Sequence, residues 1–379
     1  MSKLDEKSKL LNDDDNQDVM MGSVPSPSSA PSSSSSSFVQ WNGDSLFGAQ
    51  GRVYRFSALL LICLLTFGSY FSYDIPASIS TSLEAFFAIG DSQYALLYSV
   101  YSWPNTLMVF IGGVLIDQYL GVRVGAVLFS GLVCAGQMLF WFAGASQKFW
   151  LAIVGRVVFG LGGESLGVAQ SAYTAKFFRG KELAFAFGIA LSFARIGSAV
   201  NLNIEPVIVK AHGVPFGLFV GALLCVASLV AAVVLGLQDR FAENRRKKLA
   251  GPAAVAAAAA AADPPPKISD IRFFSLSIWL IYFICVTFYI GVFVLIQFAS
   301  QFVQHRYAVN EADAGTILSL PYLVSAGASP VLGFLVDRTG RAVWWISFAT
   351  VLLAVAQFSF FLLPGETLFS LSLSLCDCF

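Results

Sequence analysis

The chain has 379 residues, of which 56% are hydrophobic and 12% are charged. This composition excludes an ordinary soluble protein, because a soluble fold of this length cannot bury so much apolar surface. The 23 basic and 23 acidic residues balance, which argues against a nucleic-acid binder, and the 6 Cys follow neither a disulfide nor a zinc pattern. We therefore expect an all-α, polytopic membrane protein.

Residues 1–50 are polar and rich in Ser, Pro and Asp, which predicts a disordered cytosolic tail. Within it, Glu6 precedes Leu10 and Leu11. This spacing resembles the acidic dileucine sorting signal that clathrin adaptors read on lysosomal membrane proteins. The tail therefore predicts a lysosomal address and a clathrin adaptor as a partner.

Apolar segments of membrane-spanning length follow one another through the rest of the chain. We predict nine spans, at 53–73, 94–116, 122–145, 148–172, 184–208, 214–237, 272–298, 312–336 and 342–363. Six of them form an N-terminal bundle (51–240), followed by a cytosolic linker (241–270), a partial C-terminal bundle (271–363) and an atypical tail (364–379). A cytosolic N-terminus places most of the Lys and Arg on the cytosolic side, as the positive-inside rule requires.

A motif of the form G-x-x-x-D with a basic turn occurs twice, after the second and eighth spans. Its residues are Gly113, Asp117 and Arg123 in the first copy, and Gly333, Asp337, Arg338 and Arg341 in the second. The Gly is expected to let neighbouring helices approach closely. The Asp is expected to pair with the basic turn or with the N-terminus of a neighbouring helix. Two copies indicate a duplicated, two-half architecture.

This repeat resembles the signature loop of the major facilitator superfamily, and Arg156 with the glycines after it resembles the superfamily's helix-4 arginine motif. The stretches 68–76, 101–105, 162–165, 180–182 and 194–201 are similar to one branch, the lysosomal dipeptide transporters of the major facilitator superfamily domain-containing protein 1 family. The resemblance implies two halves of six spans. This chain is then expected to hold a complete six-helix N-terminal bundle and an incomplete C-terminal bundle of about three helices.

Two ionisable residues in the middle of predicted spans, Glu164 and Arg195, need a partner or a function, because a charge near the bilayer centre costs at least ~2.5–3.5 kcal/mol. They either form an ion pair with each other or bind the ammonium and carboxylate of a peptide, and the resemblance supports the second. Tyr101 and Asn105 flank a predicted kink at Pro104 and are expected to face a central cavity.

Three further polar residues belong to this expectation. Asn201 is added to the predicted substrate-binding residues on the resemblance. Arg156 is expected to tie the fourth helix to the first or to take part in state switching. Asp74, near the non-cytosolic end of the first span, is expected to be a cap or gate charge rather than a substrate ligand.

The sequence contains no pattern of a catalytic triad, nucleotide-binding loop or metal site, so we expect a protein that is not an enzyme and needs no cofactor. The resemblance implies a lysosomal uniporter that exports cationic or neutral dipeptides, and a second copy of the chain, as a homodimer, is among the partners that we expect. No N-x-Ser/Thr sequon is present, so a glycosylated single-span accessory protein is an expected partner. Two alternatives stay open: a plasma-membrane carrier of another organic solute, and a non-transporting truncated subunit.

Overall fold

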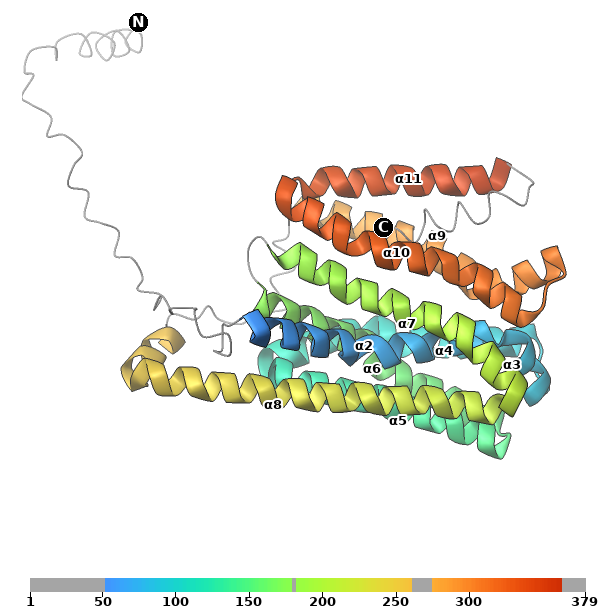
Figure 1. Ribbon diagram of the computed structural model, residues 1–379, viewed down its shortest axis with the longest axis horizontal. Coiled ribbons are helices and arrows are strands. Elements are labelled where there is room, and N and C mark those ends of the chain that lie inside the picture. The colour runs from blue at the N-terminus through green and yellow to red at the C-terminus, as the bar shows by residue number, and fades with distance from the viewer. Residues whose placement is uncertain (1–51, 179–181, 261–274, 363–379) are drawn as a thin grey trace, which may run out of the picture. The chain divides into compact units, whose positions relative to one another are not determined.

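A computed structural model describes residues 52–178, 182–260 and 275–362, and these are almost entirely helical (Figure 1). The elements are α2 (Arg52–Ser78), α3 (Ser80–Phe87), α4 (Asp91–Val114), the π-helix η1 (Leu115–Leu120), α5 (Gly121–Ser146), α6 (Phe149–Phe177), α7 (Leu183–His212), α8 (Val214–Ala260), α9 (Leu276–Tyr307), α10 (Glu311–Thr339) and α11 (Ala342–Leu362). The predicted sorting residues Glu6, Leu10 and Leu11 lie outside the described residues.

Each of the nine predicted spans coincides with one long helix of the described residues, namely α2 and α4 to α11. Helices are expected here because a chain inside a bilayer must satisfy its backbone hydrogen bonds internally. Within the described part of the chain, six helical segments are long and apolar enough to cross a membrane, the one at Asp91–Ser146 running through α4, η1 and α5. The predicted all-α, polytopic fold is therefore confirmed.

Helices α8 and α3 differ most from the predicted spans. Helix α8 does not end near 237 but continues to Ala260, through the basic run and the Ala tract that were assigned to a linker. Alanine is the strongest helix former, and the Lys247 Nζ–Glu243 Oε1 pair, 2.7 Å apart at i, i+4 spacing, supports the extension. The short helix α3 lies in the connection between the first two spans and has no counterpart among the predictions.

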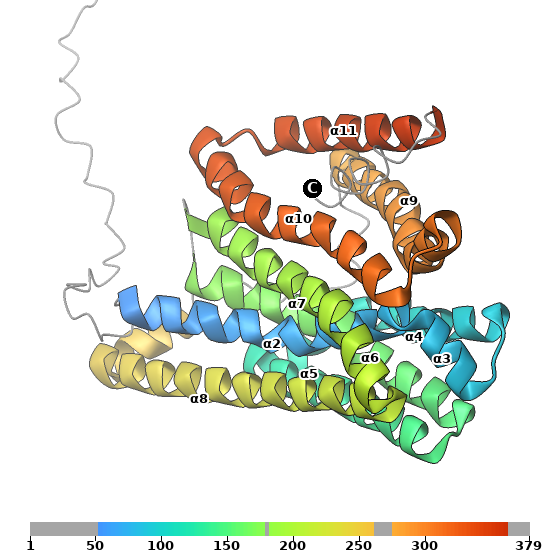
Figure 2. The same cartoon turned by 45° about the vertical axis from the view of Figure 1, so that its right-hand side comes forward.

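Helices α2 and α4 to α8 pack on one another, with α2 against α7 and α8, and α6 between α4 and α5. Helices α9 to α11 lie to one side of this group, and α10 packs along α7 in both views (Figures 1 and 2). The backbones of α7 and α10 approach closely because each helix presents a glycine to the other, Gly188 on α7 and Gly333 on α10. A Cβ on Gly188 would lie 2.5 Å from Ser329 O, and one on Gly333 would lie 2.5 Å from Ala184 O.

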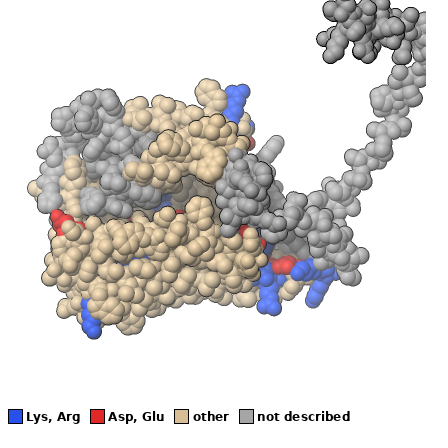
Figure 3. Space-filling model, turned by 180° about the vertical axis from the view of Figure 1, so that it is seen from behind, with Lys and Arg blue, Asp and Glu red and all other residues tan. Residues whose placement is uncertain are grey.

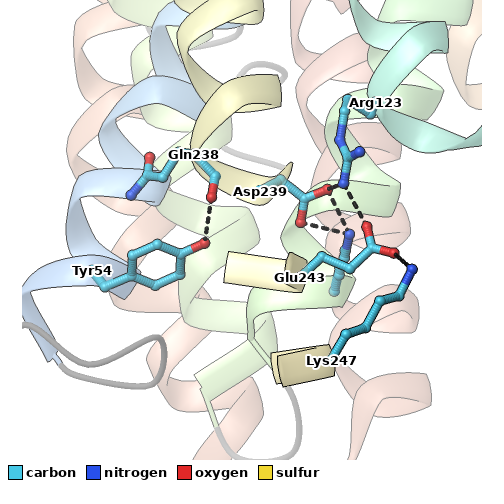
Figure 4. Close-up of polar contacts among 7 residues, drawn as sticks. Tyr54, Arg123, Gln238, Asp239, Glu243 and Lys247 are labelled. Atoms are coloured by element: carbon cyan, nitrogen blue, oxygen red, sulfur yellow. Dashed lines mark hydrogen bonds and ion pairs between the residues drawn. The ribbon is translucent and has the colours of Figure 1, made fainter. Parts of the chain in front are cut away.

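The helices define two ends of the molecule. At the end that we call the basic end, Asp239 on α8 is only 3% exposed and accepts hydrogen bonds from Arg123 (2.9 Å) and Lys176 (2.6 Å), while Glu243 binds Arg123 and Lys247 (Figure 4). We call the opposite end, where α3 lies, the α3 end. Figure 3 shows few charged side chains on the long flank between the two ends, as expected of a lipid-facing surface.

Candidate functional site

A cavity of about 410 Å³ lies between the helices, lined by side chains of α2, α4, α6, α7, α9 and α10. Four of the five predicted substrate-binding residues, Tyr101, Asn105, Glu164 and Arg195, line it. The others are Thr66, Ser69, Tyr70, Tyr73, Asp74, Val109, Gly163, Gly167, Leu191, Ser198, Tyr289 and Tyr322. The two opposite charges that the sequence singled out therefore reach one cavity.

Side chains of α4 contact Glu164 and orient it. Its carboxylate receives side-chain hydrogen bonds from Asn105 and Tyr101, and its backbone N–H donates to Asn105 Oδ1 over 3.3 Å. Gly163 makes this possible, because a Cβ there would lie 2.7 Å from the Tyr101 hydroxyl. The neighbouring Gly162 has a different role, since it faces Phe129 on α5. The carboxylate is thus oriented by α4 and exposed to the cavity.

Arg195 comes from α7 and is half-buried at the cavity wall. Its guanidinium lies over the ring of Tyr322 on α10, 5.6 Å from the centroid, which is within the range of a cation–π interaction. The guanidinium thus faces the side of the cavity that α10 forms, whereas the Glu164 carboxylate is bonded to α4.

Arg156 lies behind the cavity and is completely buried. It donates to two carbonyls of α2, those of Ser72 (3.3 Å) and Tyr73 (3.1 Å). Five aromatic rings surround its guanidinium at 5.4–5.8 Å: Tyr73, Tyr98, Tyr101, Phe140 and Phe159. Arg156 therefore ties the fourth span to the first, one of its two predicted roles.

The link to α2 has a local cause in the sequence. Pro76 lies inside α2 and has no backbone N–H, so the carbonyl four residues earlier, on Ser72, lacks its usual helical donor. The Arg156 guanidinium reaches this carbonyl. Two rings in contact with the guanidinium, Tyr73 and Tyr101, also line the cavity, so Arg156 holds part of the cavity wall in place.

Several residues lie elsewhere than expected. Asn201 is fully buried and is not among the lining residues, whereas Asp74, expected as a cap or gate charge, lines the cavity. The tyrosines Tyr70, Tyr73, Tyr289 and Tyr322 were not predicted. For α2, the polar stripe Thr66, Ser69/Tyr70 and Tyr73/Asp74 has helical spacing and is a signal that was available in the sequence. The two tyrosines from α9 and α10 have no such signal.

The second signature motif contacts the N-terminus of α7. Asp337 accepts hydrogen bonds from the backbone N–H groups of Ala184 (3.1 Å) and Phe185 (2.8 Å), at the N-terminus of α7. This is one of the two pairings expected for the motif Asp, and Gly333 provides the close approach to α7. Arg338 stacks on Phe334 at 5.5 Å, and Arg341 is exposed before α11.

The first motif differs from its prediction. A Cβ on Gly113 would meet nothing within 4 Å in the described part of the chain, so the expected close approach at this residue is wrong. The residue before it, Gly112, packs against Ser165 on α6 instead. Asp117 is exposed in η1, and Arg123 pairs with Asp239 and Glu243 of α8.

Among residues 52–178, 182–260 and 275–362, no three His, Cys, Asp or Glu side chains gather closely enough to hold a metal ion. The cavity instead offers one guanidinium, two carboxylates and a wall of tyrosines. Such a site can bind a small solute that carries both charges, by charge pairing and ring stacking.

Comparison with known proteins identifies similar chains. The sequence model of the family described as Major Facilitator Superfamily matches residues 62–378. The lysosomal dipeptide transporter MFSD1 of Homo sapiens is 41% identical over 303 residues, covering 77% of this chain. Its counterpart in Mus musculus is 40% identical over 314 residues, covering 80% of this chain. The chain spans 63% and 66% of the lengths of these two relatives.

Two solved structures share the fold. The transporter FucP in its outward conformation has a TM-score of 0.60 at 15% identity, over 86% of this chain and 81% of FucP. The human organic anion transporter MFSD10 has a TM-score of 0.60 at 16% identity, over 86% of this chain and 82% of MFSD10. At such identities the likeness concerns the arrangement of the helices alone.

Proposed function

The chain belongs to the major facilitator superfamily, and on that premise we propose that it is a lysosomal transporter that carries dipeptides from lumen to cytosol. The observation that carries the proposal is that Glu164 and Arg195, of opposite charge and from neighbouring helices, line one cavity. The similarity to the lysosomal dipeptide transporters of Homo sapiens and Mus musculus supports it.

The chemistry of the cavity fits a zwitterion. A dipeptide has an ammonium at one end and a carboxylate at the other, and in the low dielectric of a membrane protein each requires an opposite charge. Glu164 binds the ammonium and Arg195 binds the carboxylate. The second cavity carboxylate, Asp74, adds a negative charge to the lining, and we propose that it favours cationic and neutral peptides over anionic ones.

The mechanism is alternating access by uniport, in which the α2–α8 group and the α9–α11 group rock about the cavity. The basic end faces the cytosol and the α3 end faces the lumen, in agreement with the positive-inside rule. A dileucine signal at Glu6, Leu10 and Leu11 directs the chain to lysosomes through a clathrin adaptor. A glycosylated single-span protein and a second copy of the chain are further partners that we propose.

Uptake of a radiolabelled Lys-Ala dipeptide into liposomes containing the purified chain tests the proposal. We expect Glu164→Gln and Arg195→Gln each to reduce uptake at least about tenfold, which corresponds to ~1.4 kcal/mol of lost binding or transition-state energy. Glu205→Gln is the matched control, because Glu205 is a buried carboxyl of α7 that does not line the cavity. Its uptake should stay within about twofold of the parent.

Peptides lacking one charge separate the two roles. An N-acetylated peptide, which lacks the ammonium, should bind the parent weakly, and Glu164→Gln should reduce its affinity little further. A peptide with a C-terminal amide, which lacks the carboxylate, should also bind the parent weakly, and Arg195→Gln should reduce its affinity little further. Absence of saturable dipeptide uptake by the parent chain contradicts the proposal, as does equal uptake in all three variants.

A further inference from the structure

Helix α10 carries a carboxylate near each of its ends, and both carboxylates cap helices of the α2–α8 group. At the basic end, Asp337 accepts from the N–H groups of Ala184 and Phe185, the second and third residues of α7. At the α3 end, Glu311 Oε1 accepts from the N–H groups of Thr81 (2.9 Å) and Ser82 (3.3 Å), the second and third residues of α3. In both contacts one carboxylate accepts from the second and third N–H groups of a helix, through both oxygens for Asp337 and through Oε1 alone for Glu311.

Neither capped helix has a cap of its own. The N-cap residue of α3 is Ile79 and that of α7 is Glu182, and neither makes a side-chain capping hydrogen bond. The first N–H groups of a helix need acceptors, and the positive end of the helix dipole favours a negative charge. Glu311 and Asp337 satisfy this need from α10, on the other side of the cavity.

The contact at the α3 end includes more than one carboxylate. The Ser82 hydroxyl donates to Glu311 Oε2, the Thr81 hydroxyl donates to Gln304 on α9 (2.9 Å), and Gln301 donates to Glu84 (2.9 Å). All of these bonds join α3 to α9 or α10. We call Thr81, Ser82 and Glu311 the α3 latch.

From this geometry we infer that the α3 latch is the gate contact of the lumenal side, opposite the signature-loop contact of Asp337 at the basic end. Glu311 and Asp337 are 26 residues apart, about 39 Å along a helix, so they lie on opposite sides of the cavity. Rocking of α10 against α3 opens the lumenal side by separating Glu311 from its helix while Asp337 stays bound. Each carboxylate thereby stabilises one closed side.

The inference rests on the proposed transport function, but its test requires no substrate. A reporter thiol, Val109→Cys in the cavity wall, is placed in the full chain with Cys285, Cys376 and Cys378 changed to Ser. Cys63, Cys134 and Cys225 stay, because they are buried. In sealed vesicles, the reaction rate of the reporter with a membrane-impermeant thiol reagent is measured separately from the α3 side and from the basic side.

We expect Glu311→Ala to raise the rate from the α3 side about tenfold, equivalent to a shift of ~1.4 kcal/mol between states, with no rise from the basic side. Asp337→Ala should produce the opposite pattern. The matched control is Asp313→Ala, because Asp313 is a carboxylate in the same turn of α10 whose hydrogen bonds, among the described residues, go to Asn310 of its own cap. It should change neither rate by more than about twofold.

Ser82→Ala is the second variant, since it removes a donor of the latch from the other partner, and it should raise the α3-side rate about threefold. A rate from the α3 side that stays within twofold of the parent in both Glu311→Ala and Ser82→Ala overturns the inference. A rate that rises equally from both sides also overturns it, because that indicates general loosening. If the rates respond as expected while dipeptide uptake is absent, the latch stands and the substrate proposal fails.

Discussion

Arg156 should stabilise the protein mainly through the carbonyl that Pro76 leaves without a donor. Replacing Arg156 with Met keeps much of the apolar volume but removes the hydrogen bonds to Ser72 O (3.3 Å) and Tyr73 O (3.1 Å). A buried carbonyl left without a donor costs about 1–3 kcal/mol. The lost contacts with the aromatic rings add to this cost, whereas the variant no longer has to bury a cation, which offsets part of it. We therefore expect Arg156→Met to lower the free energy of unfolding by about 2–4 kcal/mol.

A second substitution separates this cause from a general packing defect. Pro76→Ala restores an N–H four residues after Ser72, which provides the missing helical donor. In the Pro76→Ala background, Arg156→Met should therefore cost about 1–2 kcal/mol less than in the parent. Pro321→Ala is the matched control, because it restores a backbone N–H inside α10 and leaves the Ser72 carbonyl of α2 unchanged.

The assay is unfolding of the purified chain in mixed micelles by titration with SDS, followed by Trp fluorescence and circular dichroism. The cycle of Arg156→Met with Pro76→Ala should show coupling, and the cycle with Pro321→Ala should be additive within ~0.5 kcal/mol. If the Pro76 cycle is also additive within that margin, the Ser72 carbonyl is not what links the two residues.

Three more predictions follow from the geometry. Gly333→Ala should lower the free energy of unfolding by about 1–3 kcal/mol, because the new Cβ meets Ala184 O at 2.5 Å. In the control Gly113→Ala the new Cβ meets nothing within 4 Å in the described part of the chain, so this change should be neutral or stabilising by up to ~1 kcal/mol. Equal effects of the two changes in the SDS titration would argue against close α7–α10 packing. Asp239→Asn should cost about 1–3 kcal/mol, because it leaves Arg123 and Lys176 without their shared, buried carboxylate. Glu243→Gln, at a half-exposed carboxylate, should cost less than ~1 kcal/mol in the same titration, and the reverse order would refute this ranking. Burial and the charge of Asp91 raise the pKa of Glu84 beside the α3 latch, the hydrogen bond from Gln301 lowers it, and the charge of Glu311 in the latch raises it again. Protonation of Glu84 removes its repulsion from Glu311, so the latched state gains stability at low pH and loses it as the pH rises through the raised pKa. The ratio of reporter-thiol rates from the α3 side to the basic side should therefore fall on acidification, and a ratio that responds equally in Glu84→Gln would exclude this carboxyl as the cause.

Local sequence determined the helices and one of their contacts. Apolar runs of spanning length fix where α2 and α4 to α11 lie, because a bilayer accepts little besides helices. The motif around Asp337 was readable in part, since the sequence offered this Asp two partners, the basic turn or a helix N-terminus, and the structure shows the second. Glu164 and Arg195 stood out because charges inside spans are costly, whatever their neighbours.

Tertiary structure decided which faces of the helices meet. A one-residue shift rotates a helical position by about 100°, which is why Gly112 and not Gly113 meets α6. The packing of α2 and α7 decides which of their faces lines the cavity, and it brings Asp74 to the cavity while Asn201 is buried away from it. The capping of α3 by Glu311 joins residues 230 positions apart, and Tyr322 of α10 meets Arg195 of α7, which lies more than 100 positions earlier. No local pattern encodes such pairs, because they depend on how two separately formed groups of helices pack against each other.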